Sequence, residues 1–186
     1  MNAVHRWYCR SGHWTDQVRD RILPWVLLDT DLGDDVLEVG PGPGVVTELL
    51  RARTTRLTSV EIDPRLAASL RERFAGSNVT VQEADATKMP FAAGSFSGAV
   101  SMTMLHHVPS SARQDELLSE IHRVLRPGAV FAGCDSRSSL FFRLAHVLDT
   151  MVLVDPETFT ERLERAGFRD VRVEVRSAAF RFRAVA

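Results

Sequence analysis

Short apolar runs alternate with amphipathic stretches along most of the chain. Runs of strand length lie at residues 36–39, 57–61, 79–86, 96–101 and 129–134, and helical patterns lie between them at 45–50, from 63 onward and at 111–125. Asp63 followed by Pro64 is typical of a helix N-cap and first helical position. Strands that alternate with helices in this way predict a parallel sheet with helices packed on its faces.

The C-terminal part departs from this alternation. A helical pattern over residues 156–166 stops at Gly167, and residues 171–175 and 180–183 then alternate apolar and polar side chains with period two. We expect these two segments to form an antiparallel pair of strands at one end of the sheet.

Together these patterns predict an α/β fold: a doubly wound, mostly parallel seven-stranded sheet with an antiparallel last strand. The sheet occupies residues 34–186 as one domain. Residues 1–33 precede it as an accessory segment of the same globule, with a helical pattern at 14–28 that Pro24 breaks. With 186 residues the chain is long enough for one full core and too short for two domains.

The first strand runs into a loop with alternating glycines, Gly40, Gly42 and Gly44, and a helix follows it. Such a unit lets backbone approach a ligand at the carboxyl end of a strand. A dinucleotide fingerprint would need a third glycine where Val45 stands, and the P-loop pattern is absent as well. Glu38, just before the loop, is a poor neighbour for phosphate and suits a ligand with positive charge.

Acids follow the next two strands at comparable positions. Glu61 ends the second strand, 21 residues after Gly40, where an acidic side chain can accept hydrogen bonds from a ribose diol. The third predicted strand ends in Asp85-Ala86.

Six motifs in this order resemble the class I S-adenosylmethionine (SAM)-dependent methyltransferases, in particular the small domains that act on quinones and natural products. They are Glu38-x-Gly40-x-Gly42-x-Gly44, Val60-Glu61-Ile62-Asp63, Asp85-Ala86, Met89-Pro90-Phe91, Leu105-His106-His107-Val108 and Leu125-Arg126-Pro127-Gly128. The resemblance covers roughly residues 34–176 and implies a Rossmann-like fold with SAM as cofactor.

The resemblance also implies roles for single residues. The methionine moiety would lie over Gly40 to Gly44, and Glu38 would help to hold its ammonium. The remaining implied contacts are Glu61 to the ribose, Ile62 against the adenine, Asp85 and Ala86 at the adenine edge, and further contacts from Pro41, Ser101 and Met102.

Two histidines follow the fourth strand, where cofactor and acceptor would meet. Methyl transfer needs a general base only when the acceptor must lose a proton, and imidazole titrates near neutrality. His106 is the candidate base, with local hydrogen bonding as the competing interpretation. His107 is expected to shape the pocket.

Charge and cysteine usage narrow the partners. The net charge of −1 gives no global attraction to nucleic acid or anionic membranes, so a small-molecule substrate is expected. Cys9 and Cys134 lack metal-ligand spacing, and no metal site is expected. A disulfide between them stays open, although a reduced cytoplasmic enzyme is the preferred interpretation. No long apolar run opens the chain, so we expect no signal peptide and no membrane span.

Two apolar segments could close an acceptor pocket: residues 5–14 and residues 136–155. Packing on the sheet or a dimer interface would explain them equally well, and a monomer or homodimer is expected. The C-terminal arginines, Arg172, Arg176, Arg181 and Arg183, are predicted to form a solvated face that protects a sheet edge.

We predict a methyltransferase that acts on a small, apolar or aromatic acceptor. Three alternatives stay open. A SAM-binding module without catalysis would bind without turnover. A methyltransferase for macromolecules is disfavoured because no basic patch is present and Ser101-Met102-Thr103-Met104 replaces the Asn-Pro-Pro-Tyr-like tetrad of amino-methylating enzymes. A nucleotide-dependent oxidoreductase is weakened by Val45.

Overall fold

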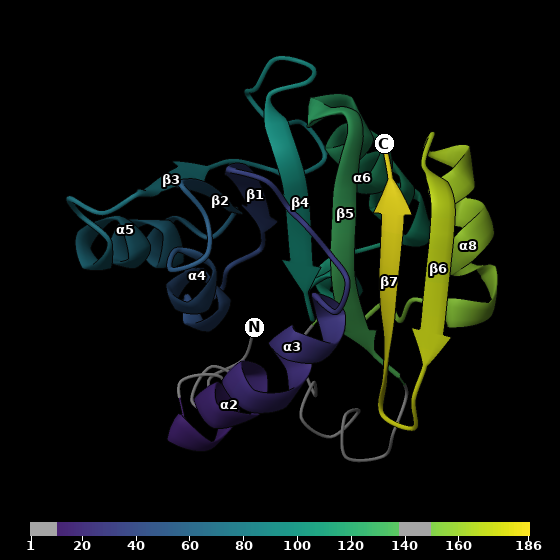
Figure 1. The fold of residues 1–186 in the computed structure, drawn as a ribbon, viewed down its shortest axis with the longest axis horizontal. Helices are drawn as coiled ribbons and strands as arrows, with labels where there is room; N and C mark the ends of the chain where they lie inside the picture. Colours follow the sequence, from purple (N-terminus) through teal and green to yellow (C-terminus); the bar gives the residue numbers. More distant parts are fainter. Residues whose placement is uncertain (1–10, 138–149) are drawn as a thin grey trace.

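The structure is a computed structural model that describes residues 11–137 and 150–186. Seven strands form one sheet in the order β3-β2-β1-β4-β5-β7-β6 (Figure 1). Their bounds are β1 Asp35–Val39, β2 Arg56–Glu61, β3 Val79–Glu83, β4 Phe96–Met102, β5 Leu125–Ser136, β6 Arg169–Val175 and β7 Ala179–Val185. The first five strands pair in parallel, and β7 runs antiparallel to both β5 and β6. The predicted doubly wound sheet is confirmed.

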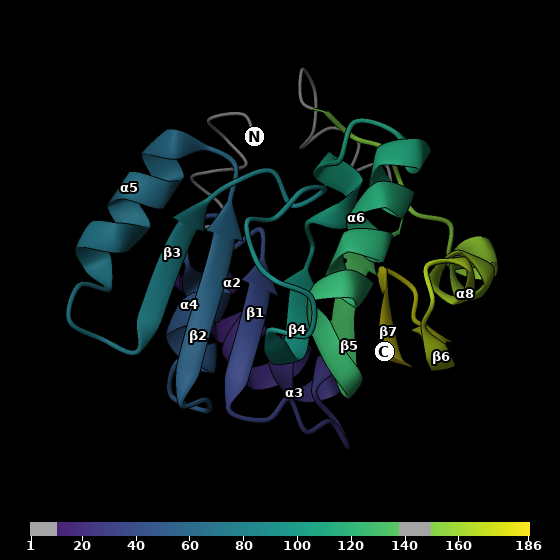
Figure 2. The same ribbon diagram turned by 90° about the horizontal axis from the view of Figure 1, so that it is seen from above.

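Helices cover both faces of this sheet. On one face lie α6 (Ser111–Val124) and α8 (Pro156–Arg165), and on the other lie α2 (Gly12–Gln17), α3 (Leu23–Val26) and α4 (Val45–Leu50) (Figures 1 and 2). The helix α5 (Pro64–Arg73) packs on β2 and β3, and Asp63 caps it by accepting from the amides of Arg65 and Leu66, as predicted.

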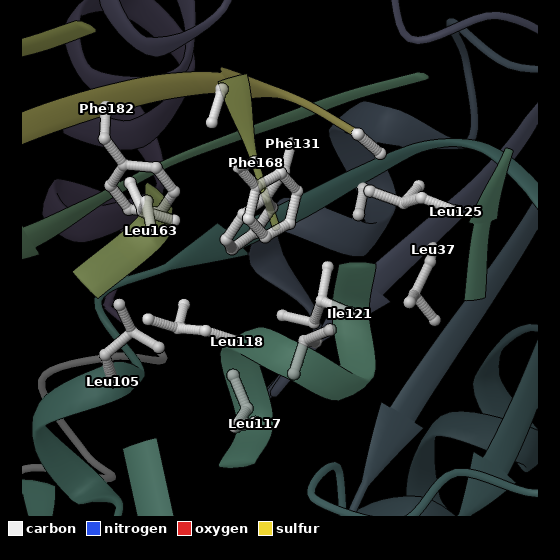
Figure 3. Close-up of a cluster of buried hydrophobic side chains, with 14 of the residues drawn as sticks. Leu37, Leu105, Leu117, Leu118, Ile121, Leu125, Phe131, Leu163, Phe168 and Phe182 are labelled. Carbon is white, nitrogen blue, oxygen red and sulfur yellow. The ribbon is translucent and has the colours of Figure 1, made fainter. Parts of the chain in front are cut away.

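The larger core cluster lies between the sheet and the α6–α8 side. Leu117, Leu118 and Ile121 recur on one face of α6, as the helical period requires, and are buried against strand residues such as Leu37 and Phe131 (Figure 3). Aromatic rings fill the space near β7, where the ring centroids of Phe131 and Phe182 are 4.9 Å apart. This packing fixes β1 and β4, whose carboxyl ends line the site.

The N-terminal helix contains a π-turn, η1 (Val18–Ile22), between α2 and α3. There the amide of Leu23 donates to the carbonyl of Val18, five residues back. Proline inside a helix clashes with the carbonyl four residues before it, and a widened turn relieves that contact. The chain therefore stays helical through Pro24, which the sequence predicted would break the helix.

Two predicted boundaries move. β3 ends at Glu83, so Asp85 and Ala86 lie in the loop after the strand and not within it. β5 begins at Leu125, directly after α6, because Leu125 already pairs with Phe96 of β4.

Two of the C-terminal arginines contact Trp25 of α3; Arg181 is too buried for the solvated face that the sequence predicted, whereas Arg176 stays exposed. The Arg176 guanidinium lies 4.3 Å from the Trp25 ring centroid, and Arg181 donates to the Trp25 carbonyl. Glu174 joins them by accepting from the Trp25 indole at 3.0 Å and from Arg181 at 2.9 Å. These contacts attach α3 to β6 and β7.

Two further expectations, on a disulfide and on membrane spans, involve residues of which the structure describes only a part. The thiol of Cys134 is buried and forms no disulfide, while Cys9 lies outside the described residues. Burial is the main cause that raises the pKa of the Cys134 thiol. Across residues 11–137 and 150–186, no helix has the length and apolar character needed to cross a membrane.

Candidate functional site

A cavity of about 440 Å³ lies at the carboxyl ends of β1, β2 and β4. Nine of the predicted cofactor residues line it together: Glu38, Gly40, Pro41, Gly42, Glu61, Ile62, Asp85, Ala86 and Met102. The predicted residues Gly44, Ser101 and His106 are not part of its wall. Ser101 is buried within β4, and the other two act behind the wall, as described below.

The three loop glycines all have positive φ, yet they serve different purposes. A Cβ at Gly40 would overlap Met104, and one at Gly44 would overlap Leu70 of α5. A Cβ at Gly42 would meet no protein atom within 4 Å. Gly40 and Gly44 therefore allow close packing of the protein itself, whereas Gly42 leaves open space in the cavity.

Glu38 carries an unusual charge environment. It is 2% exposed, and its Oε2 accepts from Thr47 Oγ1 at 2.7 Å and from Ser59 Oγ at 2.6 Å. Its Oε1 is buried and accepts no hydrogen bond from any residue that the structure describes. Burial raises the pKa of Glu38 to about 7, against the opposing effect of the two hydroxyl hydrogen bonds. Among the residues that the structure describes, this carboxyl group in the cavity thus has no cationic partner.

Glu61 joins the glycine loop to the end of β2. Its Oε2 accepts from the amide of Gly42 at 3.0 Å and its Oε1 from the amide of Asp63 at 2.9 Å. Burial raises the pKa of Glu61, and these backbone hydrogen bonds limit the rise. The carboxylate is therefore held at a fixed orientation in the cavity wall.

Asp85 lies in the loop after β3. Its Oδ1 accepts from the amide and the hydroxyl of Thr87 at 2.9 and 2.8 Å, and its Oδ2 accepts from Arg113 at 2.7 Å. Burial acts to raise the pKa of Asp85, but the Thr87 hydrogen bonds and the Arg113 charge outweigh it and hold the pKa below its usual range. Asp85 is therefore an ionised acceptor.

The structure places the two histidines in different environments. His106 is 1% exposed, and Asp135, at the end of β5, accepts from its backbone amide at 3.1 Å and contacts its Nδ1 at 2.5 Å. This position suits a residue that fixes the 3₁₀ turn η2 (Leu105–His107) more than a base that contacts an acceptor. His107 lines the cavity instead, with its ring centroid 4.2 Å from that of His106.

Apolar residues of the N-terminal helix form another wall: Trp14, Val18 and Ile22. In a regular α-helix, a residue four positions later lies about 40° further around the helix axis, so three residues spaced by four would not share one face. The π-turn over Val18–Ile22 holds more residues per turn, so it rotates less for each residue and brings Ile22 back to the face of Trp14. We call these three residues the apolar ladder. Their spacing in the sequence was the available signal, and only Trp14 belonged to a predicted pocket segment.

Polar wall residues come from other elements. Thr103, directly after β4, has φ 51°, which is rare for a β-branched residue, and its amide donates to the Cys134 carbonyl at 2.8 Å. Thr150 also lines the cavity. Of the two segments expected to close the pocket, residues 5–10 and 138–149 lie outside the described residues.

A family model and two curated relatives show which known proteins the chain resembles in sequence. A family model described as a methyltransferase domain matches residues 37–133, about half of the chain. The chain is 29% identical over 178 residues to a 2-methyl-6-phytyl-1,4-hydroquinone methyltransferase of Oryza sativa subsp. japonica, covering 94% of this chain and 50% of the relative. It is 34% identical over 141 residues to ribosomal RNA small subunit methyltransferase A of Bordetella pertussis, covering 68% of this chain and 52% of the relative.

The chain thus spans about half the length of these curated relatives. Among solved structures, it resembles phosphoethanolamine N-methyltransferase 2 of Haemonchus contortus in complex with SAM, with a TM-score of 0.74 and 16% identity. That match covers all of this chain and 60% of the other. At this identity the likeness concerns the fold alone.

Proposed function

The chain belongs to the SAM-dependent methyltransferases, and from this premise we propose that it transfers a methyl group to a small acceptor with an apolar or aromatic body. The observation that carries the proposal is one cavity whose lining residues divide by their chemistry into two parts. The first part comprises acidic residues and an open glycine backbone, and the second comprises the apolar ladder and a histidine.

The residues of the first part fit SAM. The buried Oε1 of Glu38 can accept from the ammonium, directly or through water, and Gly42 leaves room for the methionine moiety. Glu61 and Asp85 offer fixed carboxylates for the ribose and the adenine amino group. Ile62 is 67% exposed and can pack on the flat adenine ring. When bound, SAM supplies a methyl group that its positively charged sulfur activates for displacement.

The second part supports an apolar acceptor. Trp14, Val18 and Ile22 line it on the side of the N-terminal helix, and no lysine or unpaired arginine stands among the described lining residues. A wall of this kind excludes water, which favours a reaction in which charge disappears. The rice relative's name refers to a hydroquinone, an acceptor with an aromatic ring and hydroxyl groups, and such a molecule matches this wall.

His107 is the residue we assign to the acceptor. It lines the cavity on the turn that Asp135 holds through His106, so its position is preorganised. Where the acceptor is a hydroxyl group, His107 accepts its proton; where the acceptor is already ionised or is a free amine, His107 orients it. His106 keeps the supporting role that its burial indicates.

One observation favours a second candidate function. The Bordetella relative is named for ribosomal RNA, so a macromolecular acceptor has support from sequence similarity. The net charge of −1 and the residues Ser101 to Met104 at the end of β4 weigh against it. Binding of SAM without transfer is the third outcome.

Transfer of radiolabelled methyl groups from SAM separates these functions. We expect label on hydroquinones or phenols and none on small ribosomal subunits, with the Gly42→Val variant as the inactive control. Label found only on ribosomal RNA would replace the proposal with the second candidate. Binding of S-adenosylhomocysteine (SAH) by calorimetry, with no label on any acceptor, would identify a binding module.

A further inference from the structure

An arginine that the sequence analysis did not single out lies beside Asp85 in the cavity wall. Arg113, in the first turn of α6, donates from Nη2 to Asp85 Oδ2 at 2.7 Å and from Nη1 to Glu116 Oε2 at 2.6 Å. Both Arg113 and Asp85 line the cavity. Arg113 is therefore fixed on one side by its own helix and reaches the loop after β3 on the other.

These contacts leave Asp85 with little freedom. A carboxylate offers about four acceptor positions, and Thr87 fills two of them while Arg113 fills a third. The two oxygens are held from different elements, so the group cannot rotate without breaking a hydrogen bond. About one acceptor direction is left for a ligand.

The Arg113–Asp85 pair has little to do with the stability of the fold. The side chains are 44% and 40% exposed, and ion pairs with this exposure contribute little to folding because water screens them. Burial acts to raise the pKa of Asp85, and Arg113, together with the Thr87 hydrogen bonds, offsets this effect, so the group stays an ionised acceptor. The chemical effect of Arg113 is thus on what Asp85 can recognise.

We propose that Arg113 is a positioning residue that makes the site selective for a 6-amino purine by fixing the Asp85 carboxylate as an acceptor. An amino group at purine position 6 donates to such a carboxylate. An oxygen at the same position presents an acceptor to another acceptor, and both groups then lose a hydrogen-bond partner. The proposal rests on the proposed function, since it assumes that the adenosine of SAM occupies this part of the cavity.

The test compares SAH with S-inosylhomocysteine, in which oxygen replaces the 6-amino group. By calorimetry, the wild-type protein should bind SAH about 10- to 100-fold more tightly than S-inosylhomocysteine, because one hydrogen bond to a charged group contributes about this ratio. Arg113→Ala should lower SAH affinity about 3- to 10-fold and reduce the preference to a similar extent, because Asp85 must then be ordered on binding. Arg113→Lys should restore part of both, since it keeps the charge.

A double-mutant cycle shows whether Arg113 acts through Asp85. In an Asp85→Asn background, Arg113→Ala should change SAH affinity less than about twofold. Arg123→Ala is the matched control, because Arg123 lies on the same helix, pairs with Glu120 three residues before it and does not line the cavity. This variant should leave the preference unchanged.

The inference would be overturned by an unchanged preference in Arg113→Ala, by tighter SAH binding in that variant, or by additive effects in the cycle. An equal loss of preference in Arg123→Ala would also do so, since it would point to helix docking in general. If the wild-type protein binds neither nucleoside, the proposed function itself fails. The two failures are therefore distinguishable.

Discussion

Replacing Glu38 with Gln should stabilise the ligand-free protein and weaken its ligand binding. Glutamine keeps an acceptor for Thr47 and Ser59 and removes the buried charge. The pKa of Glu38 is about 7 in the folded protein and 4.5 for the ordinary side chain. A raised acid pKa means that the folded state binds the proton more tightly, so the stability that Glu38 contributes is fully present below about pH 4.5 and is lost as the pH rises through about 7.

The difference of about 2.5 pKa units corresponds to about 3 kcal/mol. At pH 8 the Glu38→Gln variant should therefore be up to about 3 kcal/mol more stable than the parent, which raises the Tm by roughly 6–12 °C for a chain of this size. At pH 4 the two proteins should melt together, because the parent carboxyl is then protonated in both states.

Thermal unfolding from pH 4 to pH 8 measures this difference, and calorimetry with SAH at pH 7.5 measures binding. The variant should bind SAH about 10-fold more weakly, because the ammonium loses a charged acceptor. Glu48→Gln serves as the control, since Glu48 is partly exposed and its pKa is lowered by Arg51. A Glu38→Gln variant that is no more stable at pH 8, or equally stabilised at pH 4, would refute the reasoning.

Three further predictions concern the same cavity. Glu61→Ala should weaken SAH binding, measured by calorimetry, by about 2–4 kcal/mol. Asp63→Ala should lower the Tm, because α5 loses its N-cap, and should leave SAH binding nearly intact. If the two variants showed each other's behaviour, both roles would be contradicted. Gly42→Val should abolish SAH binding while the domain stays folded by circular dichroism, and Gly76→Val, with similarly positive φ and no atom near its Cβ position, should keep binding. On a hydroxyl acceptor, His107→Ala should lower turnover about 10²- to 10⁴-fold, whereas on a free amine it should lower turnover only slightly, and equal losses on the two acceptors would exclude the base role.

The features that could be predicted from the sequence are those that depend on a few neighbouring residues. The strand, glycine loop and helix around Gly40 follow from local pattern, and so does the cap of α5 by Asp63. Carboxyl ends of parallel strands meet at one edge of a sheet, so Glu38 and Glu61 could be expected in one site from the sequence alone.

The missed features depend on contacts between distant parts of the chain. The local pattern around His106 and His107 does not reveal which ring is buried and which lines the cavity. Asp135, 29 residues after His106, determines this through its contact with His106 Nδ1. Gly44 matches the loop pattern, yet its lack of a side chain serves packing against Leu70. The role of Arg113 needed the fold that brings α6 beside the loop after β3.

The π-turn in the N-terminal helix has a consequence for how the length of this chain can vary. A turn closed over five residues holds one residue more than an α-turn, and Arg19, Asp20 and Arg21 within it are all exposed. Deleting one of them would keep the flanking helices in phase, but Pro24 would then clash in a regular helix. A deletion among these three positions and the loss of Pro24 should therefore occur together among natural variants of this domain.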